Sequence, residues 1–274
     1  MQAEPIPEVY LGTSGFSFDD WRGPVYPENL PKPQWLTFYE QQIGFNALEI
    51  NYTYYQMPSH RTLEGMIRKT TDRFSFSIKT HRSLTHDVIQ DGAIADNPKA
   101  FEEFRESMRP LVDAGRLGCV LAQFPYAFFN SHDNREYLAK TIDRLGHLNL
   151  VVEFRNKSWV TAHTFELLRR HNVGICTVDE PALPRLMPWL SEMTSDIAYV
   201  RFHGRNAPKW FGTSTEDRYN YLYSDEELQE LAERVRAIAP KVRRLHLYFN
   251  NCHAGSAAKN AKTLKALLSP VLHA

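Results

Sequence analysis

The stretch IAYVRFHGRN, residues 197–206, carries the pattern that decides the fold of this 274-residue chain. It is a short apolar run in which side chains alternate, with Val200 and Phe202 on one face and Arg201 and His203 on the other. Such alternation predicts a β-strand with one apolar face and one polar face. Seven further runs of strand type lie along the chain, at residues 9–15, 47–55, 73–81, 117–125, 149–156, 173–181 and 242–250.

Helical patterns fill most of the intervals between these runs, at residues 34–43, 60–70, 98–113, 134–145, 162–171, 225–238 and 256–268. Alternating strands and helices predict a parallel sheet, and eight units in roughly 250 residues favour a closed barrel. An open doubly wound sheet usually carries GxGxxG after its first strand, whereas this chain has GTSGFSF. We therefore expect an α/β fold: a single (β/α)8 TIM barrel of eight parallel strands, with ordered loops at its C-terminal mouth. The domain is expected to span residues 1–274, with a core of about 9–268.

The composition is that of a soluble globular protein, with 43% apolar and 23% charged residues. Lys plus Arg and Asp plus Glu each number 32, and this zero net charge argues against coating nucleic acid through bulk charge. The first seven residues do not resemble a signal peptide, and no apolar run approaches the ~20 residues of a membrane span. We expect a cytoplasmic protein without a membrane partner. The three widely spaced cysteines argue against a disulfide framework, and the oligomeric state stays open.

Polar residues on the strands define a candidate site. In seven strands they share one face near the C-terminal end, and that face is expected to point into the barrel. Active sites of TIM barrels lie at this mouth, and an unsatisfied buried polar group costs about 1–3 kcal/mol. The inward set comprises Glu49, Asn51, Lys79, Gln123, Glu153, Arg155, Asp179, Arg201, His203, His246, Tyr248 and Asn250. A competing interpretation is an ion network that only supports the fold.

A series of motifs resembles the DUF72 (YecE-like) family over residues 9–261. The motifs occur in the order GTSGFSFDDW, PVYP, EINYTYYQMP, FSFSIKTHRSLTH, QFP, EFRNKSW, RFHGR and YFNNCHAGSAAKNA. The resemblance implies a TIM barrel and implies no particular reaction. The positions that match the family pattern are Glu49, Asn51, Lys79, His86, Gln123, Glu153, Arg155, Trp159, Arg201, His203, Gly204, Arg205, Asn250, Asn251 and Gly255. The sequence departs from it at Tyr52 and Tyr54, where the family commonly has Ser and Phe.

Cations clustered among amides suit an oxyanion, because Arg grips phosphate or carboxylate with two parallel hydrogen bonds. Many TIM barrels hold a phosphate between the loops after strands seven and eight, beside a helix N-terminus such as that expected at Ser256. We therefore expect an enzyme acting on a small anionic, phosphate-bearing ligand, with phosphoester hydrolysis as the first reaction to test. Glu49 or Glu153 would be the general base and His203 the general acid or orienting group. The expected ligand contacts are Asn51, Lys79, Gln123, Arg155, Arg201, Arg205, Tyr248, Asn250 and Ser256.

Three alternatives stay open. The first is a non-catalytic module for a nucleotide or single-stranded nucleic acid, using aromatics near the mouth such as Tyr54, Tyr55 and Trp210. The second is a sugar isomerase or lyase. The third is a divalent metal held by Glu49, Glu153, Asp179 and His203, but no HxH, HExxH or DxD spacing supports it. No metal ligand or other cofactor is therefore predicted.

Overall fold

Eight parallel strands form a closed barrel, which confirms the predicted fold class. The structure, a computed structural model, describes residues 6–90, 93–212 and 215–272. Neighbouring strands follow the order β1-β10-β9-β8-β7-β6-β3-β2, returning to β1. The strands are β1 (Glu8–Ser14), β2 (Ala47–Ile50), β3 (Ser75–Lys79), β6 (Leu117–Gln123), β7 (Leu150–Glu153), β8 (Gly174–Asp179), β9 (Ile197–Phe202) and β10 (Arg244–Phe249). That the chain forms one domain stays a prediction.

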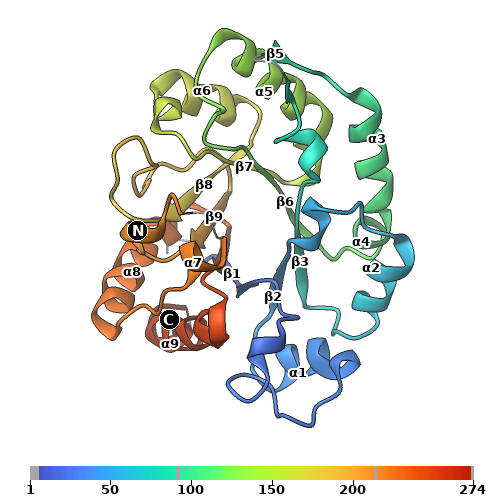
Figure 1. Ribbon diagram of the computed structural model, residues 1–274, viewed down its shortest axis with the longest axis vertical. Helices are drawn as coiled ribbons and strands as arrows, with labels where there is room; N and C mark the ends of the chain where they lie inside the picture. Colours follow the sequence, from blue (N-terminus) through green and yellow to red (C-terminus); the bar gives the residue numbers. More distant parts are fainter. Residues whose placement is uncertain (1–5, 91–92, 213–214, 273–274) are drawn as a thin grey trace.

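Helices surround the barrel, as Figure 1 shows. They are α1 (Trp35–Gln41), α2 (His60–Ile67), α3 (Pro98–Ser107), α4 (Arg109–Asp113), α5 (His132–Leu145), α6 (Ala162–Arg170), α7 (Thr215–Tyr219), α8 (Asp225–Ile238) and α9 (Ser256–Leu272). Local sequence sets where several of them begin. The side chains of Ser59, Ser131 and Thr161 each accept a hydrogen bond from a first-turn backbone N–H. Ser224 and Glu227 form a reciprocal capping box at the start of α8.

The predicted helix over residues 98–113 is wrong in one respect, because it is divided into α3 and α4 at Met108. Pro110 explains the break, since it has no N–H to donate to the carbonyl four residues earlier and its ring crowds that turn. A two-stranded hairpin, β4 (Ile89–Gln90) with β5 (Ala93–Ile94), was not expected. The loop over residues 180–196, which is described throughout, contains no helix between β8 and β9.

The alternation predicted for residues 197–206 continues across the neighbouring strand. β9 and β10 pair in register, so Val200 faces Leu247 and Arg201 faces Tyr248. The apolar partners are fully buried under the helices. On the opposite side, aromatic rings fill the lower part of the barrel. His246 stacks on Tyr10 with ring centroids 4.6 Å apart and lies 5.8 Å from the ring of Tyr199. The barrel interior is therefore a packed core below the mouth.

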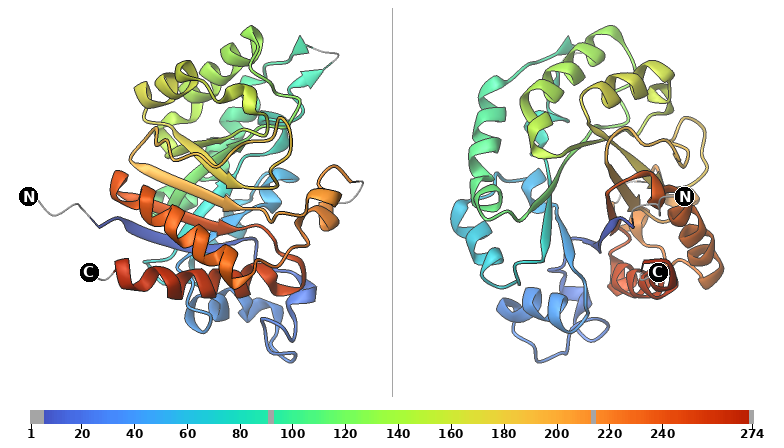
Figure 2. Two further views of the ribbon diagram at one scale, coloured as in Figure 1. Left: turned by 90° about the vertical axis from the view of Figure 1, so that its left-hand side faces the viewer. Right: turned by 180° about the vertical axis from the view of Figure 1, so that it is seen from behind.

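The two chain termini lie at the end of the barrel opposite the long loops after β8 and β9, as the left view in Figure 2 shows. In the loop over residues 16–33, Trp21 and Tyr26 are fully buried. Trp21 donates from Nε1 to the Cys252 carbonyl at 2.7 Å, and Tyr26 stacks on Trp35 at 4.6 Å. No helix within the described residues is long and apolar enough to cross a membrane.

Candidate functional site

A cavity of about 490 Å³ opens at the C-terminal mouth of the barrel. Its volume lies within the range of roughly 300–1,000 Å³ that is usual for small-molecule sites. The residues that line it are Asn51, Tyr54, Tyr55, Lys79, His86, Gln123, Pro125, Tyr126, Arg155, Leu186, Arg201, Trp210, Phe211, Arg218, Tyr219 and Asn250. Six of the predicted ligand contacts are thus brought together: Asn51, Lys79, Gln123, Arg155, Arg201 and Asn250.

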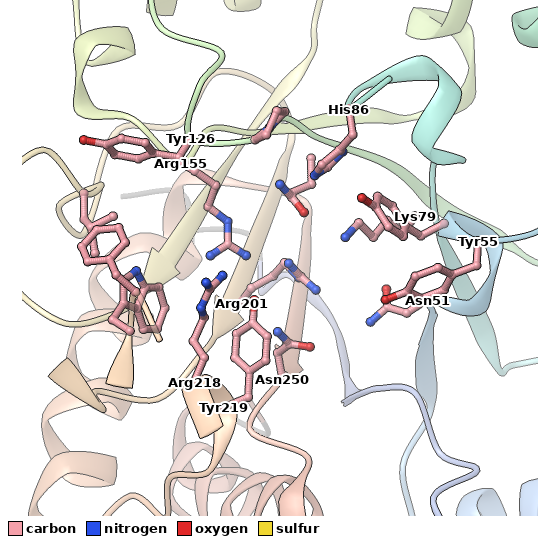
Figure 3. Close-up of a pocket in the computed structure, with 16 residues that line it drawn as sticks. Asn51, Tyr55, Lys79, His86, Tyr126, Arg155, Arg201, Arg218, Tyr219 and Asn250 are labelled. Carbon is pink, nitrogen blue, oxygen red and sulfur yellow. The ribbon is translucent and has the colours of Figure 1, made fainter. Parts of the chain in front are cut away.

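The charge of the lining is positive. Lys79 and three arginines contribute, and among the described residues that line the cavity there is no Asp or Glu. The guanidinium groups of Arg155 and Arg218 point toward each other in Figure 3, beside Arg201, and Lys79 reaches inward from the opposite wall. Arg155 and Arg201 are paired with glutamates behind the lining, whereas Lys79 and Arg218 have no ion-pair partner among the described residues, so the remaining positive charge favours an anion in the cavity.

Arg201 lies in the floor of this cavity and forms hydrogen bonds to two buried glutamates. It donates to Glu49 from Nε at 2.9 Å and from Nη2 at 2.7 Å, and to Glu153 from Nη1 at 2.7 Å. All three side chains are at most 2% exposed. Tyr199 donates a further hydrogen bond to Glu49 at 2.7 Å. We call Arg201, Glu49 and Glu153 the floor network, and it resembles the ion network of the competing interpretation.

The candidate acid–base residues lie in or directly beside this floor and are absent from the residues that line the cavity. Glu153 also pairs with Arg155 at 2.6 Å and with His203 at 3.3 Å. Burial opposes the charge on Glu153, but Arg155 and Arg201 outweigh it and hold its pKa well below the usual value. Burial, together with Arg155, lowers the pKa of His203 to about 3. At neutral pH, Glu153 is therefore a paired carboxylate and His203 an uncharged ring whose Nδ1 accepts a hydrogen bond from the Asn250 amide nitrogen at 3.1 Å.

Lys79 differs from the arginine of the floor because its ammonium group faces the cavity without an acid beside it. Nζ lies 4.4 Å from the centre of the Tyr54 ring, a cation–π distance. Within the described part of the chain, no carboxylate lies at ion-pair distance from it. Burial and the charge of Arg201 lower the pKa of Lys79 to about 7. A substantial share of this amine is therefore uncharged at neutral pH.

Three predicted ligand contacts do not line the cavity. Arg205 turns away to a separate cluster, where it binds both oxygens of Asp179 at 2.8 and 3.0 Å and pairs with Glu230 at 3.1 Å. Tyr248 lies deeper in the barrel, fully buried, and shares a hydrogen bond with Ser77. Ser256 is the first residue of α9 and is not among the lining residues.

Several lining residues were not singled out as ligand contacts from the sequence. Arg218 and Tyr219 lie on α7, in the long loop after β9, and the Arg218 guanidinium lies 5.6 Å from the Trp210 ring. No strand periodicity predicts that such a loop residue reaches the cavity. An arginine next to a tyrosine in a long loop is the one sequence feature that could have indicated a binding role. His86, which matched the family pattern, lines the cavity, and burial followed by Lys79 lowers its pKa to about 3.

The donor set does not suit a divalent metal. Glu49 and Glu153 are occupied by Arg201, and Asp179 by Arg205 and the Tyr223 hydroxyl at 2.6 Å. Over residues 6–90, 93–212 and 215–272, no group of three or more His, Cys, Asp or Glu side chains is placed to hold a metal ion.

Comparison with known proteins gives a consistent result over nearly the whole chain. Residues 10–273 match the family described as "Protein of unknown function DUF72". The UPF0759 protein YunF of Bacillus subtilis (strain 168) is 26% identical over 271 residues, covering 95% of this chain and 94% of that protein.

Solved structures extend this likeness. A DUF72 family protein from Thermotoga maritima (TM1631) is 44% identical, with a TM-score of 0.87, and the match covers 96% of this chain and 99% of that one. A DUF72 family protein from Enterococcus faecalis (EF0366) is 25% identical, with a TM-score of 0.83 and 95% of each chain covered.

Proposed function

This chain belongs to the DUF72 family, and we propose that its mouth cavity binds a small anionic, phosphate-bearing ligand on which the protein acts. One observation carries the proposal: the cavity is lined by Lys79 and three arginines, and its described lining contains no carboxylate. Of these cations, Lys79 and Arg218 have no ion-pair partner among the described residues, and keeping them charged at a partly buried site destabilises the fold, because burial disfavours the charged form and like charges repel. An anionic ligand would remove that repulsion.

Two of the lining arginines are oriented to bind an anion. The guanidinium groups of Arg155 and Arg218 point toward each other on the wall opposite Lys79 (Figure 3). The planar guanidinium group forms two parallel hydrogen bonds to phosphate or carboxylate, so an anion between them would be bound from both sides. Arg218 has a buried Nε with no hydrogen-bond partner within the described chain, which leaves a donor for the ligand. Asn51 also has a buried amide oxygen without a partner there, and it lines the same cavity.

The rim favours a ligand with a planar or hydrophobic part. Tyr54, Tyr55, Tyr126, Trp210, Phe211 and Tyr219 line the cavity, and Tyr55 and Phe211 are 74% and 64% exposed. Aromatic rings beside arginines stack with nucleobases. A nucleotide is therefore the first phosphate-bearing ligand to test, and binding without turnover would indicate the non-catalytic module as the alternative function.

The acid–base assignment of Glu49, Glu153 and His203 is not part of this proposal. Glu49 and Glu153 neutralise Arg201, and His203 is a fully buried, uncharged ring at neutral pH. Phosphoester hydrolysis would require one of them to leave that arrangement during the reaction. A sugar isomerase or lyase acting on a neutral polyol has less support, because the cavity presents cations where a polyol would need free carboxylates.

The test is binding of inorganic phosphate and of adenosine monophosphate, measured by calorimetry on the full chain. Arg218→Ala is expected to weaken the tighter ligand by about 10-fold or more, since a hydrogen bond to a charged group contributes about 1.5–3 kcal/mol. Arg170→Ala is the matched control, because Arg170 lies on α6 with a side chain 70% exposed, and it should leave the affinity unchanged. Absence of binding by the wild-type protein, or equal affinities for wild type and Arg218→Ala, would contradict the proposal.

A further inference from the structure

Among the described residues that line the cavity, Lys79 is the one cation that can act as a nucleophile, because guanidinium groups stay protonated and a lysine amine does not. It lies at the C-terminal end of β3, and its Nζ faces the ring of Tyr54 at 4.4 Å. The Thr53 hydroxyl donates to the Lys79 carbonyl at 2.6 Å and anchors the backbone there. The amine is thus held on a strand, partly buried, with the cavity in front of it.

The surroundings of this amine disfavour its charged form. The charged and titratable groups that act on it from the packed elements are Glu49 on β2, Tyr54 after β2, His86 after β3, Glu153 and Arg155 at the end of β7, and Arg201 on β9. Burial, Arg201 and Arg155 disfavour the ammonium form, and the two glutamates favour it. Both glutamates are already hydrogen-bonded to Arg201, so neither neutralises Lys79 directly. A lysine that only supported the fold would be expected to pair with one of them.

We propose that Lys79 forms an imine with a carbonyl group of the ligand, so that the substrate class is a phosphate-bearing aldehyde or ketone. This inference rests on the proposed function, because the arginines must hold the anionic group while the carbonyl reaches the amine. The lining offers both parts in one cavity: Arg155 and Arg218 on one wall and Lys79 on the other (Figure 3).

Formation of the imine needs only the amine, the carbonyl group of the ligand and proton transfer. The Nζ lone pair attacks the carbonyl carbon, and the π-electron pair of the carbonyl moves to its oxygen, which takes up a proton as nitrogen releases one. Loss of water from this carbinolamine, with a further proton on the departing oxygen, leaves a protonated imine. The product carries the same single positive charge as the ammonium form of Lys79. His86 lines the cavity as an uncharged ring at neutral pH and can relay the protons.

Pyridoxal 5′-phosphate is a direct probe, because it carries both an aldehyde and a phosphate. The full wild-type chain would be incubated with it at pH 7.5, reduced with borohydride and mapped by peptide mass spectrometry. We expect labelling at Lys79 to exceed labelling at the exposed Lys157 by about 10-fold or more, since burial lowers the pKa of Lys79 to about 7 and leaves much of its amine uncharged at this pH. The rate of labelling at Lys79 should rise with a midpoint near pH 7.

A second ligand separates the two proposals. Pyridoxine 5′-phosphate has the phosphate but no aldehyde, so its binding tests the anion site alone. If it binds but borohydride labels Lys79 no more than Lys157, the imine is overturned and the anion site stands. If Lys79 is labelled but pyridoxine 5′-phosphate does not bind and inorganic phosphate does not compete, the anion site is overturned instead.

Variants complete the test. Lys79→Arg keeps a cation on β3 and cannot form an imine, so it should lose the label at residue 79 and bind pyridoxine 5′-phosphate within a few-fold of wild type. Lys157→Arg should leave labelling at Lys79 unchanged. The site map on the wild-type chain decides the inference even if a substitution at Lys79 prevents folding.

Discussion

The floor network and the cavity lining above it use the same residue types in opposite ways. In the floor, Arg201 meets Glu49 and Glu153 at 2.7–2.9 Å, and all three are buried. In the lining, Lys79 and Arg218 have aromatic neighbours and no acid of the described chain at ion-pair distance. Deep in the barrel, a charge needs a fixed partner because water cannot solvate it. At the mouth, a charge can remain available for a ligand.

Arg205 lies outside the cavity and can be compared with Arg201 in its floor. It follows Arg201 by four residues, and both were expected to bind an anion. Arg205 instead holds Asp179 at 2.8 Å in a cluster with Tyr223 and Glu230. Arg205 therefore lies outside the cavity, whereas Arg201 contributes to the cavity floor while paired with Glu49 and Glu153.

The largest expected effect comes from breaking the floor network. Arg201→Met leaves Glu49 and Glu153 buried without their main partner, which should lower the free energy of unfolding by about 3–5 kcal/mol. Denaturant unfolding at pH 7 measures it. Combining Arg201→Met with Glu49→Gln and Glu153→Gln should recover much of the loss. A loss below about 1 kcal/mol in the single variant would show that the floor charges are not stabilising partners.

The next largest effect is expected from acid, which should destabilise the folded protein through its buried histidines. Burial lowers the pKa of both His203 and His246 from 6.5 to about 3, so each contributes stability that is present above about pH 6.5 and is lost as the pH falls toward 3. Each contributes about 1.4 kcal/mol per pH unit within that window.

His246→Phe isolates one of these contributions, because the new ring can keep the stacking on Tyr10 and Tyr199. Unfolding measured between pH 6 and 4 should show a slope smaller by about 1.4 kcal/mol per pH unit in the variant. Equal slopes for variant and wild type would mean that His246 is charged in the folded protein.

A smaller effect is expected at Arg205, which pairs with Asp179 outside the cavity, and it can be compared with the effect at Arg218 in the cavity lining. Arg205→Ala removes charged hydrogen bonds to Asp179 and should cost about 1.5–3 kcal/mol of stability, while the affinity for phosphate stays within two-fold of wild type. Arg218→Ala should do the reverse, with reduced affinity and a stability change within about 0.5 kcal/mol. Paired unfolding and calorimetry measure both. A fall in affinity in Arg205→Ala would move the proposed anion site toward Asp179.

The last effect concerns Lys79 and is expressed as a change of stability with pH rather than at a single pH. Its folded pKa of about 7 lies below the unfolded value of 10.5, so wild-type stability increases as the pH rises from 7 to 10.5, where the unfolded chain binds the extra proton. Lys79→Met should therefore be most favourable relative to wild type near pH 6, and the stability of the wild type should gain on that of the variant by about 1.4 kcal/mol per pH unit between pH 7 and 10. A constant difference between the two proteins over this range would indicate that Lys79 keeps its ordinary pKa.

Much of the fold followed from periodicity in the sequence. The alternation at Val200, Arg201 and Phe202 recurs in the other strands, and helix caps such as Ser131 and Ser224 are local signals. The break at Met108 was missed because a strong helical pattern on both sides hid the effect of Pro110. The same alternation assigned the inward face correctly for Asn51, Lys79, Gln123, Arg155, Arg201 and Asn250, which line the cavity.

Periodicity in the sequence could not predict how deep an inward-facing side chain lies in the barrel or which residue it pairs with. Glu49 and Arg201 are 152 residues apart, and their hydrogen bonds exist only because the closed barrel brings β2 and β9 together around a common interior. Arg218 enters the cavity from a loop without periodicity. The sequence by itself determined which residues face inward, since that depends on neighbours along a strand. Only the tertiary structure decided which of those charges are neutralised and which remain available, because pairing depends on distance across the barrel and on exclusion of water.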